Sequence, residues 1–98
     1  MKLGLSLTGM GQQPVGTDMH AHYQQIVEYV RHANDLGFDF IYQGQHYLTA
    51  PYQQLQTIPM LSRLAGEADG MEIVATLLIP LQHPVDLAEQ MATLDIIT

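Results

Sequence analysis

The spacing of apolar residues along the chain alternates between the pattern of a strand and that of a helix. Leucines at every second position from residue 3 to 7 predict a first strand. Apolar residues then recur at helical spacing between His20 and Leu36. A short run of aromatic and β-branched residues follows at Phe38–Tyr42 and predicts a second strand. The predicted strands are Lys2–Leu7, Phe38–Tyr42 and Glu72–Ile79. The predicted helices are His20–Leu36, Thr57–Ala68 and a segment that starts at Pro84.

Residues that start and stop helices support these boundaries. Thr17 or Asp18 can cap the first helix, and Gly37 stands where a left-handed stop is expected. Gly70 ends the second helix. The third predicted strand is almost continuously apolar, which is typical of a strand covered on both faces.

The element order β-α-β-α-β-α predicts an α/β fold with a parallel sheet. Three such units cannot close a (β/α)8 TIM barrel, which needs eight units and about 250 residues. We therefore interpret residues 1–98 as the N-terminal part of a single barrel domain, supplying about its first three βα units. The alternative is a small open sheet that pairs with something else, because its edges would be free.

His46 is the first candidate for chemistry. It follows the second strand after Gly44, within the long loop Gly44–Gln56. In a parallel barrel, a side chain placed just beyond the carboxyl end of a strand points into the active-site mouth. A second long loop, Thr8–Asp18, follows the first strand and is expected to border the same mouth.

Composition excludes several classes of function. The net charge of −7 disfavours binding to nucleic acid, and the three basic residues are scattered. The absence of cysteine excludes disulfides and thiolate metal sites. No apolar run is long enough to span a membrane and no signal peptide is recognisable, so a cytoplasmic protein is expected.

Three segments resemble the bacterial-luciferase-like, flavin-dependent oxidoreductases, and the resemblance covers essentially the whole chain. The segments are Gly44-Gln-His-Tyr-Leu48, Pro80-Leu-Gln-His-Pro-Val85 and Ala88-Glu-Gln-Met-Ala-Thr-Leu-Asp95. The Pro-x-x-His-Pro segment followed by Ala-x-x-x-Ala-Thr-Leu-Asp is fairly specific, whereas the segment around His46 alone is weak.

The resemblance implies a TIM barrel, usually dimeric, that binds reduced FMN at its carboxyl mouth. It implies a monooxygenase that uses O2 to oxidise a small organic substrate, with reduced FMN supplied by a flavin reductase. His46 then corresponds to the family's active-site histidine. Ala75 and Thr76 correspond to a flavin-contacting position where the family commonly has a non-proline cis peptide bond, which costs about 3–4 kcal/mol.

The motif departs from the family pattern at two positions. Gln45 replaces the usual Glu of the family's Glu-His-His-Phe segment, and Tyr47 replaces its second His. Some relatives use the deazaflavin F420 and transfer hydride without oxygen, so an F420-dependent oxidoreductase is the main alternative. A non-catalytic fragment that only binds a partner is the third hypothesis.

The other histidines and the glycine-rich loop have simpler interpretations. His83 precedes Pro84 and is interpreted mainly as a helix cap, with contact to flavin or substrate as the alternative. His20 and His22 are assigned to a solvated helix start, and no metal site is predicted. The loop Thr8–Gly11 lacks the full Gly-x-Gly-x-x-Gly pattern of a dinucleotide site.

Overall fold

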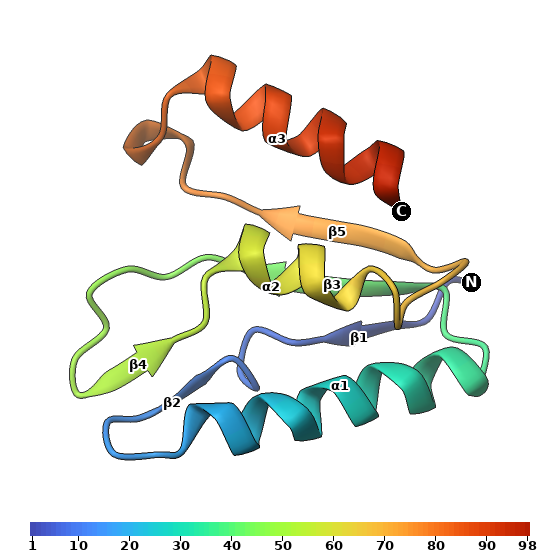
Figure 1. Cartoon of the computed structure of the whole chain (residues 1–98), viewed down its shortest axis with the longest axis horizontal. Helices are drawn as coiled ribbons and strands as arrows, with labels where there is room; N and C mark the ends of the chain where they lie inside the picture. The colour runs from blue at the N-terminus through green and yellow to red at the C-terminus, as the bar shows by residue number, and fades with distance from the viewer.

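The computed structural model describes residues 1–98 as an α/β fold around one parallel sheet. The sheet order is β1-β3-β5, and each strand is followed by a helix (Figure 1). Helices are the usual connection between parallel strands. The strands are β1 (Gly4–Ser6), β3 (Phe40–Gly44) and β5 (Glu72–Thr76). The helices are α1 (Met19–Asp35), α2 (Thr57–Leu64) and α3 (Pro84–Ile97).

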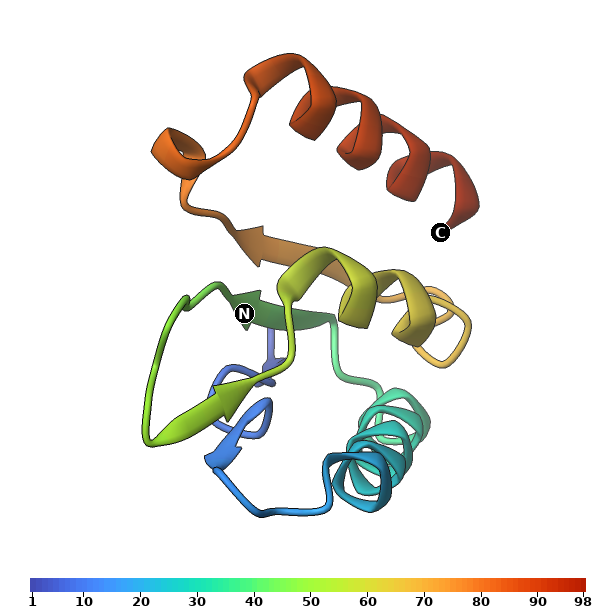
Figure 2. The same ribbon diagram turned by 60° about the vertical axis from the view of Figure 1, so that its left-hand side comes forward.

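A second, antiparallel ribbon joins the two long loops that follow β1 and β3. It consists of β2 (Gln12–Pro14) and β4 (Tyr52–Gln54), with Gln13 opposite Gln53. Figures 1 and 2 show this ribbon on the side to which the arrowheads of β3 and β5 point. The sequence pattern predicted only loops here, so this pairing is a feature that it missed.

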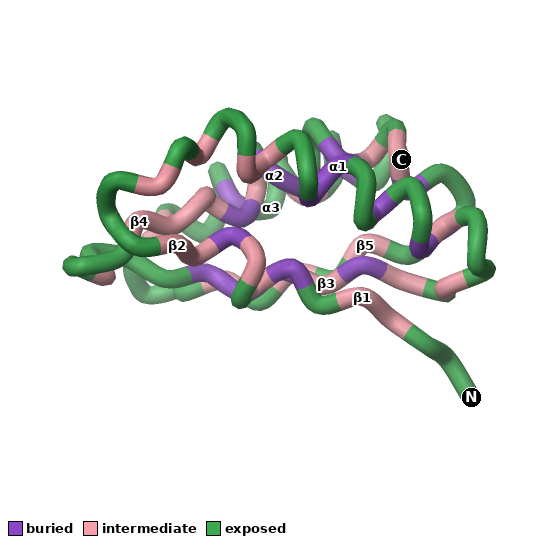
Figure 3. Tube along the Cα trace, turned by 90° about the horizontal axis from the view of Figure 1, so that it is seen from below, coloured by how far each residue is buried: buried purple, intermediate pink, exposed green.

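All three helices lie on one face of the parallel sheet, and no element covers the other face (Figure 3). Side chains alternate between the two faces along a strand. The row Leu5, Ile41 and Ile73 packs into the core on the helix side. The next row, which contains Tyr42 and Val74, faces the opposite side, where Val74 is 39% exposed. We call this side the bare face.

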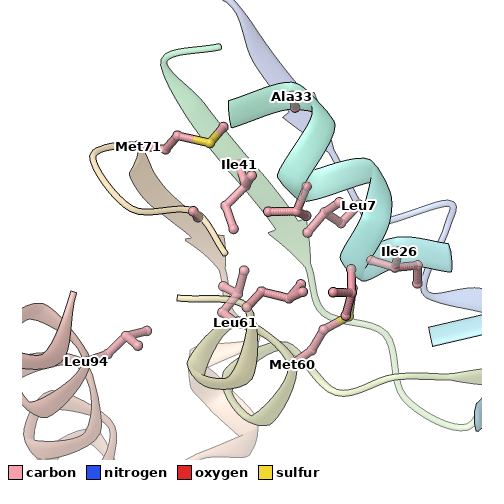
Figure 4. Packing of buried hydrophobic residues seen from close by; sticks show 12 residues of the cluster. Leu7, Ile26, Ala33, Ile41, Met60, Leu61, Met71 and Leu94 are labelled. Carbon is pink, nitrogen blue, oxygen red and sulfur yellow. The ribbon is translucent and has the colours of Figure 1, made fainter. Parts of the chain in front are cut away.

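The hydrophobic core lies between the sheet and the helices. Ile41 is fully buried at the centre of the sheet, beneath residues of α1 and α2 such as Ile26 and Leu61 (Figure 4). The core cluster consists of twelve residues: Leu7, Ile26, Val27, Val30, Ala33, Ile41, Met60, Leu61, Leu64, Ala68, Met71 and Leu94.

The signals for both ends of α1 and for the start of α3 are confirmed. The Asp18 carboxylate accepts a hydrogen bond of 3.0 Å from the Ala21 amide, so it caps α1. Gly37 has a φ angle of +80°, the left-handed conformation expected at a helix stop. Gly70 has a φ angle of +81° but lies in the turn beyond α2, so the prediction that it ends this helix is wrong. Helix α3 begins at Pro84, as predicted.

The third strand corrects the sequence interpretation. Strand β5 ends at Thr76, and the segment that follows forms a 3-10 turn, η1 (Ile79–Leu81). Exposed and half-buried residues alternate along β5, so residues 1–98 cover only one face of this strand. The continuous apolar run extends beyond the strand because Leu77 and Leu78 belong to the following loop. Helix α2 is also shorter than predicted, ending at Leu64.

Candidate active site

Gly44, the last residue of β3, is held between two threonines. Its amide donates to Thr8 Oγ1 at 2.8 Å, and its carbonyl accepts from Thr57 Oγ1 at 3.1 Å. Thr8 follows β1 and the fully buried Thr57 begins α2. These bonds fix the carboxyl end of β3, and therefore the point at which the chain enters the loop that carries His46.

His46 is exposed in this loop, and its backbone is anchored to the start of α2. Its carbonyl accepts a hydrogen bond of 3.0 Å from Gln56 Nε2. Beside it lies an open hollow of about 380 Å³. The lining residues are His46, Leu48, Thr49, Ala50, Tyr52, Gln53, Gln54 and Gln56. The imidazole is thus free to meet a ligand, while its main chain is fixed.

Thr76 lies at the same edge of the sheet as His46. Strands β3 and β5 are parallel, and Thr76 is the register partner of Gly44, two residues before His46. Thr76 is exposed, and it shares the bare face with Val74. The side chain of Ala75 packs against the hydrophobic core instead. Of the two candidate cofactor positions, Thr76 therefore exposes its side chain at this edge, whereas Ala75 does not.

The predicted cis peptide bond between Ala75 and Thr76 is wrong. The only cis peptide bond in the chain joins Ala50 and Pro51. Residues 75 and 76 continue the parallel register with Gln43 and Gly44, so this part of β5 is a regular ladder.

Gln45 connects the loop after β3 to the segment after β5. Its side chain is 8% exposed. Gln45 Oε1 accepts from the Leu78 amide at 2.9 Å and from Gln82 Nε2 at 2.8 Å. At the other end of the same amide, Gln45 Nε2 donates to Tyr47 Oη at 2.8 Å. One buried amide thus holds two segments of the carboxyl edge together.

The charged contacts gather at the opposite, amino edge. Glu67 accepts hydrogen bonds from Arg63 at 2.7 Å and from Arg31 at 3.1 Å, and these bonds lower the pKa of Glu67 below its usual 4.5. Asp39 also lies at this edge, where its carboxylate accepts from the Leu3 amide at 2.7 Å. The ion pairs therefore join α1 to α2, away from His46.

Comparison with known proteins decides the family. The family of luciferase-like monooxygenases matches residues 1–98. The chain belongs to this family. A search of curated proteins found no match.

Membership in the luciferase-like monooxygenases supports a general oxidoreductase or monooxygenase role. It also agrees with the parallel α/β fold, in which active sites lie at the carboxyl edge of the sheet. No helix of the structure is both long and apolar enough to cross a lipid bilayer.

The other histidines lie outside this cluster or have structural partners. His22 Nε2 lies 2.6 Å from the Met10 carbonyl, which ties α1 to the first long loop. The neighbouring His20 is exposed. His83 occupies the cap position of α3, but its side chain makes no capping bond, so that part of the prediction is wrong.

The glycine-rich loop packs against the ribbon. Gly11 is buried, and a methyl group added there would lie 3.2 Å from the side-chain nitrogens of Gln43 and Gln54. The segment leads into β2 and not into a helix. Both features argue against a dinucleotide site, in which such a loop opens a helix.

The sequence did not predict the polar side chains that fix the carboxyl edge of the sheet. Thr8, Gln45 and Thr57 make the bonds that shape the edge. Gln45 could be noticed only as a departure from the family motif, and the two threonines carry no periodic signal.

Proposed function

We propose that the protein is a flavin-dependent monooxygenase that uses reduced FMN and O2 to oxidise a small organic substrate. In this proposal, residues 1–98 form the first three βα units of a (β/α)8 barrel. The site lies at the carboxyl edge of its strands, with His46 as the catalytic residue and with Ala75 and Thr76 against the flavin ring.

The observation that carries the proposal is the shared edge of His46 and Thr76. His46 follows β3, and Thr76 is the last residue of the neighbouring parallel strand β5, in register with Gly44. The three helices cover only one face, which is the arrangement of a barrel wall with its helices outside (Figure 3). The bare face would then become the interior of the barrel, and its carboxyl edge the mouth.

The residues at this edge suit a flat aromatic ring. Thr76 is small and exposed at the end of β5, so a planar group can approach the edge of the sheet there. Ala75 would contribute through its main chain, since its side chain is turned to the core. When bound, reduced FMN supplies the electrons that activate O2.

His46 would move a proton at the substrate. An imidazole nitrogen can take a proton from a substrate oxygen and return it, which is general acid–base catalysis. The exposed side chain and the anchored carbonyl of His46 fit this role, because the ring can reach a ligand from a fixed main chain.

The experiment is to replace His46 by alanine in the full-length protein. We expect oxidation of the substrate with reduced FMN and O2 to fall by about 10²-fold or more. His32→Ala is the matched control, because His32 is exposed near the far end of α1. An H46A variant that turns over like the wild type would remove the catalytic role.

The same assay separates the two cofactors. Activity with F420 in place of reduced FMN would assign the protein to hydride transfer on the same fold.

We also propose a cytoplasmic homodimer served by a flavin reductase. Exposed apolar residues on α3 (Val85, Ile96 and Ile97) support further packing on this helix.

A further inference from the structure

We propose that Tyr47 donates a hydrogen bond to a ring carbonyl oxygen of the bound flavin, and that Gln45 orients the Tyr47 hydroxyl for this bond. The inference rests on the proposed function, because it takes a flavin as the ligand. It adds a cofactor-binding side chain at a position where the chain departs from the family motif.

The direction of the hydrogen bonds around Gln45 is fixed by a backbone group. The Leu78 amide can only donate, so the Gln45 atom 2.9 Å from it must be the oxygen. The atom at the other end of the amide is therefore the nitrogen, which can only donate. It lies 2.8 Å from Tyr47 Oη, so the tyrosine oxygen must accept.

The consequence is a free donor at the edge of the site. A phenol hydroxyl has one hydrogen and can both donate and accept. Because its oxygen accepts from Gln45, its hydrogen must point elsewhere, and it has no acceptor within the chain. The Tyr47 side chain is 40% exposed, so a ligand can reach this hydroxyl.

The contacts of Gln45 place the Tyr47 hydroxyl close to the proposed position of the flavin ring. The same side chain holds Leu78, only two residues beyond Thr76, where we propose that the flavin ring lies. Tyr47 is therefore held beside the end of β5. The flavin ring and the deazaflavin ring both carry carbonyl oxygens at their edges, and these accept hydrogen bonds.

Two substitutions remove the donor in different ways. Tyr47→Phe deletes the hydroxyl but leaves the bonds from Leu78 and Gln82 to Gln45. Gln45→Glu keeps those bonds, but a carboxylate can only accept, so Tyr47 would turn its hydrogen toward residue 45. Tyr29→Phe is the control, because Tyr29 is 51% exposed on α1 and makes the same chemical change elsewhere.

The measurement is equilibrium dialysis of dithionite-reduced FMN and reduced riboflavin against the full-length protein without oxygen. We expect Y47F and Q45E each to bind both flavins about two- to tenfold more weakly, with Y29F unchanged. Riboflavin lacks the phosphate, so its binding also removes any effect of charge repulsion between FMN and the carboxylate that Q45E introduces. Thermal melting of each variant verifies folding.

The remaining outcomes are decisive. Unchanged binding by Y47F would overturn the inference while leaving the proposed function intact. Weaker binding of FMN but not of riboflavin would assign the contact to the phosphate and overturn the ring contact. A loss in Y47F alone would remove the role of Gln45. A wild type that binds neither reduced FMN nor reduced riboflavin would reject the proposed function and this inference with it.

Discussion

Gly4 and Phe40 face each other across the first pair of parallel strands. They are register partners on the bare face, and the Phe40 ring lies over the Gly4 backbone. A methyl group at position 4 would overlap the ring atoms Cδ2, Cε2 and Cζ of Phe40. The absence of a side chain at residue 4 therefore leaves the space that the Phe40 ring occupies beside β1.

Gly4→Ala should force the Phe40 ring aside. We expect a loss of about 1–3 kcal/mol in the free energy of unfolding, typical of overpacking. Gly66→Ala is the matched control, because a methyl group there meets no atom within 4 Å. Denaturant unfolding of both variants makes the comparison. Equal stabilities would show that the ring moves at no cost.

Gln45 and Tyr47, the two departures from the family motif, lie side by side in the fold. Gln45 and Tyr47 are bonded to each other, so the two changes form one contact. An amide in place of a carboxylate reverses the direction of that bond. The sequence alone marked both positions but could not reveal that they touch.

At the scale of elements, Glu67 joins α1 to α2 through Arg31 and Arg63. Its side chain is 14% exposed, whereas the two arginines are at least half exposed. The pKa of Glu67 is lowered, so its ionised form stabilises the folded chain. This contribution is present above the usual pKa of 4.5 and is lost as the pH falls through the lower pKa of the folded state.

Glu67→Gln should therefore change how stability depends on pH. We expect the melting temperature of the wild type to exceed that of E67Q at pH 7, and the difference to shrink below about pH 4.5. The effect should be small, because solvent screens the two arginines, which are at least half exposed. Thermal melts from pH 7 to 3 test this. A difference that stays constant with pH would contradict it.

The sequence predicted the strongly periodic elements and failed where pairing is nonlocal. Helix α1 appeared within one residue of its bounds, since its apolar stripe and its Asp18 cap are local signals. The ribbon of β2 and β4 could not be seen, because three-residue strands of Gln, Pro and Tyr have no distinct pattern. Their pairing depends on contacts between residues about 40 positions apart.

The site shows the same division. His46 was identified because a strand followed by glycine marks the edge of a parallel sheet. The direction of the Ala75 side chain could not be predicted, because a continuous apolar run does not reveal which residues face the helices. The trans bond at 75–76 likewise depends on the regular register with β3, which no local signal carries.

At the scale of the whole molecule, the fold separates a charged amino edge from a polar carboxyl edge. Ion pairs join the helices at the first, and His46, Gln45 and Thr76 gather at the second. The bare face between them carries apolar residues such as Phe40 and Tyr42, which an enclosed barrel would bury. This asymmetry is the physical basis for assigning the chemistry to one edge.

A crystal structure of the full-length protein with reduced FMN bound tests this assignment most directly. The account predicts the flavin ring against the end of β5, in contact with Thr76 and with His46 facing the same cavity. A ring bound at the amino edge, beside Asp39 and Glu72, or on the helix side of the sheet, would contradict it.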